Sequence, residues 1–212
     1  MAMEMKAPPI ANPAALGLGG FALTTFVLST HNAGWAPDLT WVGLAFFYGG
    51  LAQFAAGMWE FKTGNTFGAT AFSTYGAFWM SLATFVVLVL YGKVPAGDIS
   101  HDLGWFLLAF AIFNTYMMLW SLRVSVAVFG VFLTLEITEI LLFLGAFNGQ
   151  AAGNGLTLIG GYVGVITALV AWYASAATVA NSMRAEPILP VGSPLWSEPS
   201  TMASAAPIQH GG

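Results

Sequence analysis

The chain has 212 residues, of which 58% are hydrophobic and only 7% are charged. An ordinary soluble domain carries roughly 25% charged residues, so a water-soluble fold of this size could not cover its surface. The net charge of -4 is spread thinly, and no basic run indicates a nucleic-acid partner. The sequence contains no cysteine, which excludes disulfides, thiolate metal sites and cysteine nucleophiles.

Six apolar segments follow one another along the chain, each long enough to cross about 30 Å of hydrocarbon as a helix. They span residues 14–30, 39–61, 67–91, 103–122, 124–147 and 156–181. Short connections rich in turn-forming residues separate them. The sequence therefore predicts an all-α membrane protein, a bundle of six transmembrane helices. We expect a short N-terminal segment, a transmembrane domain and a flexible Pro/Ser/Ala-rich tail, at residues 1–11, 12–181 and 182–212.

The distribution of basic residues predicts which way the bundle faces. Counting spans from the N-terminus, Lys6, Lys62, Arg123 and Arg184 fall on the side of both termini, and only Lys93 falls on the other side. Lys and Arg are enriched on the cytoplasmic side of membrane proteins, so both termini are expected in the cytoplasm. The N-terminus lacks the pattern of a cleaved signal peptide, and we expect the first helix to be retained.

Two helix starts on the cytoplasmic side carry residues that suit a helix N-terminus. Asn12 and Pro13 open the first apolar segment, and Asn65 or Thr66 opens the third. The free amides of such ends carry partial positive charge and can attract a carboxylate or phosphate. The alternative is that these residues only satisfy the backbone of their own helix.

Ionisable side chains within an apolar segment are costly and face a bundle interior or water. Glu136 and Glu139 in the fifth segment are three residues apart and share a helix face. If both are buried as neighbours, they should hold a proton between them, which makes them candidates for proton coupling. The alternative is a pair of neutral or hydrogen-bonded groups at a helix interface. Other polar residues at membrane depth are Thr24, Thr25, Gln53 and Asn114.

Motifs of the common enzyme classes are missing. The sequence has no HExxH, GxSxG, P-loop or dinucleotide motif. With three histidines and no cysteine, a metal site would need unusual ligands, and we expect neither a metal nor a cofactor. An enzyme is possible only as an unconventional carboxylate-based membrane hydrolase, and none is predicted.

Two stretches of the sequence resemble a known family. NPAALGLGGF at residues 12–21 resembles the NPxPLGL signature of the acetate uptake transporters, the family of bacterial succinate-acetate permeases and fungal acetate and ammonia export related proteins. The block FYGGLAQFAAGMWEFKTGNTFGATAFSTYGAFW at 47–79 is similar to the second and third helices of that family, and HNAG at 31–34 fits its first loop. The similarity spans residues 11–181, and Ala15 stands where the family usually has a second proline.

The resemblance implies a six-helix protomer that assembles as a homohexamer in the lipid bilayer of the cell membrane. Each protomer would carry its own route for acetate and sometimes succinate, narrowed by a hydrophobic constriction of Phe21, Tyr75 and Leu135. Glu136 and Glu139 depart from the family, which is apolar in this region. The candidate substrate-binding residues are Asn12, Thr24, Thr25, Asn65 and Thr66.

Two hypotheses of different classes follow. In the first, the protein transports acetate and related short carboxylates through a pathway in each protomer, either as a channel or coupled to protons. In the second, it is a membrane sensor or scaffold that binds acetate without conducting it.

Overall fold

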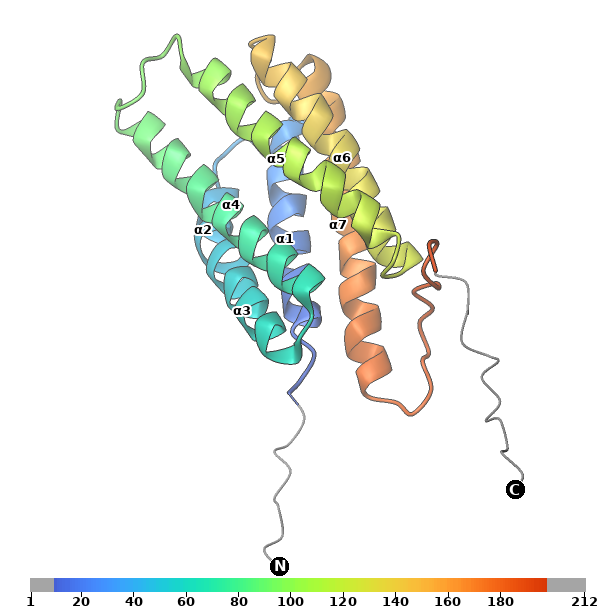
Figure 1. Cartoon of the computed structure of the whole chain (residues 1–212). Coiled ribbons are helices and arrows are strands. Elements are labelled where there is room, and N and C mark those ends of the chain that lie inside the picture. The colour runs from blue at the N-terminus through green and yellow to red at the C-terminus, as the bar shows by residue number, and fades with distance from the viewer. Residues whose placement is uncertain (1–9, 198–212) are drawn as a thin grey trace, which may run out of the picture.

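The computed structural model describes residues 10–197, and this part of the chain confirms the predicted all-α bundle. Six of its helical spans are long and apolar enough to cross a membrane (Figure 1). The second span, Trp41–Thr63, is made of three consecutive elements. In chain order the elements are α1 (Ala14–Asn32), α2 (Trp41–Phe46), η1 (Phe47–Ala52), α3 (Gln53–Thr63), α4 (Thr66–Leu90), α5 (Ile99–Ser121), α6 (Val126–Phe147) and α7 (Gly155–Ser182).

The helices form one bundle around a shared apolar core. α1 packs along α7 and also contacts η1 and α3, α6 lies against both α5 and α7, and α4 packs on α3. The start of α1 and the end of α7 lie at the same, lower end of the bundle in Figure 1. Large apolar side chains such as Phe47, Ile112 and Leu169 are exposed on the outside. An apolar exterior of this kind suits contact with lipid or with another subunit.

The second span changes geometry in its middle, within the sequence FYGGLA. η1 is a π-helix over Phe47–Ala52. A Cβ at Gly49 would lie 2.5 Å from Oγ1 of Thr24 in α1, and a Cβ at Gly50 would collide with the carbonyl oxygen of Ala45. The two glycines therefore allow both the wider turn and the close approach to α1. The sequence predicts an uninterrupted helix over 39–61 and misses this segment, a kind that is frequent at functional sites.

Glycines near the start of α1 serve helix packing. A Cβ at Gly20 would lie 2.6 Å from the carbonyl oxygen of Tyr48 in η1, and one at Gly17 would lie 2.7 Å from the ring of Phe72 in α4. A Cβ at Gly161 of α7 would collide with the backbone at the end of α1. Close backbone approach is a main source of helix association in lipid. These small residues fix α1 against three neighbours at once.

The segment after α7 returns along the bundle. Oδ1 of Asn181 accepts hydrogen bonds from the backbone nitrogens of Ile188 (2.9 Å) and Leu189 (3.0 Å). Further on, the ring of Trp196 stacks on that of Trp120 in α5, with 6.1 Å between centroids. The sequence predicts a flexible tail from residue 182, but through residue 197 the segment makes these contacts with the bundle. Residues 1–9 and 198–212 lie outside the described residues.

Gly57→Ala tests the close contact between α3 and α4. A Cβ at Gly57 would lie 2.5 Å from the backbone nitrogen of Ser73. The helices must separate to admit it, so we expect a loss of about 1–3 kcal/mol in the free energy of unfolding, although Ala is the better helix former. Gly43→Ala in the same span is the matched control, because nothing lies within 4 Å of a Cβ there. Thermal unfolding in detergent measures both, and equal melting temperatures would contradict the packing argument.

Candidate functional site

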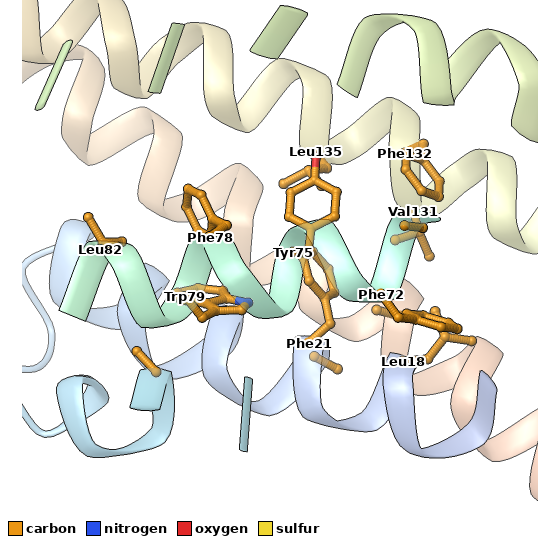
Figure 2. Packing of buried hydrophobic residues seen from close by; sticks show 14 of the residues in the cluster. Leu18, Phe21, Phe72, Tyr75, Phe78, Trp79, Leu82, Val131, Phe132 and Leu135 are labelled. Carbon is orange, nitrogen blue, oxygen red and sulfur yellow. The ribbon is translucent and has the colours of Figure 1, made fainter. Parts of the chain in front are cut away.

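Three side chains from three helices meet in the middle of the bundle. Phe21 of α1, Tyr75 of α4 and Leu135 of α6 are 4%, 3% and 6% exposed. The ring of Phe21 packs edge-on against that of Tyr75, with 5.7 Å between centroids. All three line a cavity of about 20 Å³, which holds about one water molecule. The trio implied by the resemblance therefore lies together around one small buried cavity, and this cluster is here called the throat (Figure 2).

A much larger cavity lies between the throat and the end of the bundle away from the termini. It has a volume of about 440 Å³, and most of its walls are aliphatic side chains, among them Leu82 and Leu107. Phe78 lies between Leu82 and Tyr75 on α4 (Figure 2). Its ring packs on that of Phe110 in α5, with 4.7 Å between centroids. A layer of aromatic rings therefore separates the large cavity from the throat.

A buried hydrogen-bond network, here called the acid network, joins α4, α5 and α6 beside the throat. The hydroxyl oxygen of Tyr75 lies 2.9 Å from Oδ1 of Asn114 and 3.3 Å from Oε1 of Glu139. Nδ2 of Asn114 donates to Oε2 of Glu136 over 2.7 Å. The hydroxyl of Thr115 lies 2.7 Å from Oε1 of Glu136 and 2.9 Å from the carbonyl oxygen of Ala111, and its single proton points to one of these two oxygens. The two glutamates are only 9% and 3% exposed. They are linked through Asn114 and Tyr75.

The N-terminus of α4 is occupied by a carboxylate of the protein itself. Asn65 caps this helix, because its Oδ1 accepts from the backbone nitrogen of Gly68 over 3.1 Å. Its Nδ2 donates to Oε2 of Glu60 over 3.0 Å. Glu60 of α3 is 1% exposed and also accepts from the hydroxyl of Thr63. Thr66, the first residue of the helix, is exposed. The carboxyl of Glu60 therefore lies beside the N-terminus of α4, bonded to the side chains of Thr63 and Asn65.

The remaining predicted binding residues lie outside the throat cavity. Asn12 is exposed, and Pro13 rather than Asn12 immediately precedes α1. The side chain of Asn12 still satisfies the helix, since its Oδ1 accepts from the backbone nitrogen of Ala14 over 3.0 Å. Thr24 and Thr25 are buried, and neither lines the throat cavity. Both hydroxyls lack a hydrogen-bond partner.

Sequence reasoning noted Asn114 as a polar residue at membrane depth but assigned it no role. It did not consider Thr115 or Glu60. The only signal for Glu60 is an acidic residue five positions before a capping Asn, close to a predicted helix start. That spacing brings Glu60 and Asn65 into contact only because α3 and α4 pack against one another.

Six apolar spans around a closed internal throat, with a cavity on one side of it, define a multi-pass membrane protein of the transporter or channel class. Residues 2–192 match the GPR1/FUN34/yaaH family, and the chain belongs to that family.

Two relatives and one solved structure show how close the likeness is. The chain is 42% identical to acetate permease A of Emericella nidulans, over 92% of this chain and 70% of that protein. It is 36% identical to the succinate-acetate/proton symporter SatP of Escherichia coli, over 86% of this chain and 96% of that protein. The structure of the bacterial acetate channel SatP is similar with a TM-score of 0.81 at 36% identity, covering 87% of this chain and 100% of that chain.

Asn65→Ala tests the junction of α3 and α4. The substitution removes the cap of α4 and one donor to the buried Glu60, so we expect a loss of about 1 kcal/mol or more in the free energy of unfolding. Asn12→Ala is the matched control, because the Asn12 side chain is exposed and bonds only to Ala14. Its loss should be smaller. Thermal unfolding in detergent compares the two variants, and an equal or greater loss for Asn12→Ala would contradict this account.

Proposed function

We propose that the protein moves acetate and related short carboxylates across the membrane through a pathway inside each protomer. The observation that carries the proposal is the succession of an apolar cavity of about 440 Å³ and a closed throat in the same bundle. The cargo is taken from the relatives, which are named as an acetate permease, a succinate-acetate/proton symporter and an acetate channel. Movement of a small acid needs no covalent chemistry, and no enzymatic activity is proposed.

The throat suits this task because it combines apolar walls with one polar group. Phe21 and Leu135 provide apolar walls for the methyl group, and hydrophobic constrictions of this kind close a pathway by excluding water. Tyr75 adds a hydroxyl at the same level, directed to the acid network. Passage requires at least one of the two rings to move, because the throat cavity is no larger than about one water molecule.

We propose further contacts for the cargo along the route. Asn12, Asn65 and Thr66 lie exposed at the end of the bundle where α1 begins, so they would meet a carboxylate that enters or leaves there. Thr24 and Thr25 on α1 have hydroxyls free of partners, which can donate to a carboxylate if η1 moves away from α1.

The setting of the pathway is also a proposal. The four-to-one distribution of Lys and Arg favours both termini in the cytoplasm and the cell membrane as the location. A homohexamer is proposed from the resemblance, and the apolar exterior of the bundle provides surface for subunit contacts as well as for lipid.

Glu136 and Glu139 are proposed to couple transport to protons. Both are buried beside the throat, and Glu139 contacts the hydroxyl of Tyr75. Carboxyl groups in such a site change protonation with their surroundings, and a proton gained there compensates negative charge next to the path of an anion.

Phe21→Ala tests the throat. Removing the ring widens the constriction, so uptake of radiolabelled acetate into proteoliposomes should rise severalfold. Phe26→Ala is the matched control on the same helix, because Phe26 packs against Trp172 and lies outside the throat cavity. Its uptake should equal that of the unaltered protein. If every form gave the same uptake as empty vesicles, transport would be excluded and the non-conducting sensor would be favoured.

Replacing both glutamates with glutamine tests proton coupling. The double variant Glu136→Gln and Glu139→Gln cannot titrate at these positions, so the pH dependence of protein-mediated acetate uptake between about pH 5 and 8 should flatten. The measurement is uptake at each pH with the empty-vesicle value subtracted, since acetic acid also crosses lipid unaided. An unaltered pH profile would contradict a coupling role for the pair.

A further inference from the structure

The orientation of the Asn114 amide is fixed by its surroundings. The carbonyl oxygen of Phe132 can only accept a hydrogen bond, and it lies 3.0 Å from one end of the amide, which must be the nitrogen. The same nitrogen lies 2.7 Å from Oε2 of Glu136. The amide oxygen of Asn114 therefore faces the hydroxyl of Tyr75 at 2.9 Å and acts there as an acceptor.

The hydroxyl of Tyr75 has one proton and two oxygen neighbours. Oδ1 of Asn114 is the closer at 2.9 Å, and Oε1 of Glu139 lies at 3.3 Å. A phenol donates one hydrogen bond and can also accept. When its proton points to Asn114, the contact with Glu139 is a hydrogen bond only if the carboxyl of Glu139 is protonated and donates to the Tyr75 oxygen.

The two carboxyl groups receive unequal numbers of donors. Oε2 of Glu136 accepts a hydrogen bond from Asn114, and its Oε1 shares the hydroxyl proton of Thr115 with the carbonyl oxygen of Ala111. Glu139 has only the contact with Tyr75, and its Oε2 is buried without a partner. Hydrogen-bond donors stabilise an ionised carboxyl, whereas a buried oxygen without a donor favours the neutral acid.

No basic side chain within residues 10–197 compensates the pair. The titratable group that contacts it is Tyr75 of α4, and neither α1 nor α7 carries an Asp, Glu, Lys or Arg. The lysines and arginines of residues 10–197 lie at the end of α3 or in the connections between and after helices: Lys62, Lys93, Arg123 and Arg184. Two neighbouring buried charges of one sign without a counter-ion are strongly unfavourable.

We propose that Glu139 holds the single exchangeable proton of the pair, that Glu136 stays ionised, and that Asn114 is the positioning residue that imposes this difference. The hydrogen bonds then run in one direction. Glu139 donates to Tyr75, Tyr75 donates to Asn114, and Asn114 donates to Glu136. Every proton in the series has an acceptor, and the series ends on the carboxylate that Asn114 stabilises.

This inference deepens the proposed transport function and rests on it for the following step. Tyr75 belongs to both the throat and the acid network, so a carboxylate at the throat can take its proton while Tyr75 takes the proton of Glu139. The O–H bonds of Tyr75 and Glu139 break, and new O–H bonds form on the cargo and on Tyr75. The cargo passes the apolar throat as the neutral acid, and Glu139 is left ionised until it regains a proton from water.

Infrared difference spectroscopy of the purified protein in detergent tests the protonation assignment without any transport. At neutral pH the unaltered protein should show the C=O stretching band of a protonated carboxylic acid. Glu139→Gln should abolish that band, and Glu136→Gln should retain it. Glu60→Gln, at a buried carboxyl outside the network, identifies any contribution from that residue. Loss of the band in Glu136→Gln alone, or in neither glutamate variant of the pair, would overturn the assignment.

The role of Asn114 has its own test. Asn114→Leu removes the donor to Oε2 of Glu136, and Thr115→Val removes the hydroxyl beside its Oε1, so a second protonated-carboxyl band should appear in both. Thr134→Val is the matched control on α6, because its hydroxyl bonds only to backbone carbonyls of its own helix, and it should leave the spectrum unchanged. Thr115→Val makes the test possible even if Asn114→Leu does not fold. A folded Thr115→Val variant without a second band would overturn the positioning role.

The two proposals fail separately. If the infrared bands follow the assignment while proteoliposomes show no acetate flux above empty vesicles, the transport function is wrong and the protonation assignment stands. If flux is present and the bands contradict the assignment, transport proceeds without the proton of Glu139.

Discussion

The arrangement of the bundle interior depends on Tyr75, which packs through its ring and forms hydrogen bonds through its hydroxyl. The ring of Tyr75 closes the throat against Phe21, and its hydroxyl contacts Asn114 and Glu139. A buried hydroxyl without a partner costs about 1–3 kcal/mol, so the ring stays in the throat while its hydrogen bonds last. Moving this ring out of the throat would therefore require its hydroxyl to exchange hydrogen-bond partners.

The packing of α4 determines how this exchange can occur. α4 is held to the second span by close backbone contacts, since a Cβ at Gly76 would lie 2.6 Å from the backbone nitrogen of Phe54. Toward α5 it is linked mainly by side chains, including the rings of Phe78 and Phe110 and the bond from Tyr75 to Asn114. Side-chain contacts can be remade without moving a helix, whereas close backbone contacts at a glycine cannot. The α4 and α5 boundary is thus the adaptable side of the throat.

Local patterns in the sequence predict some features well and others not at all. Length and apolarity indicate the six spans, and helical periodicity places Glu136 and Glu139 on one face. The throat trio comes only from resemblance, because Phe21, Tyr75 and Leu135 lie on three helices and no spacing relates them. The bond of Glu60 to Asn65 and the link from Asn114 to Glu136 depend on the register between neighbouring helices. The π-helical turn depends on contact with α1, and none of these is encoded within one segment.

An acidic pair beside a pathway for carboxylates would oppose an anionic cargo, since like charges repel strongly in a partly buried setting. The arrangement of donors removes the conflict. In the proposed arrangement Asn114 donates to Glu136, and a proton on Glu139 leaves no second charge. Because ionising a buried carboxyl is costly, Glu139 keeps a proton that it can pass to the cargo. The cargo then crosses the apolar throat more easily as a neutral acid. In this view the glutamates do not oppose the cargo but supply the proton that lets it pass.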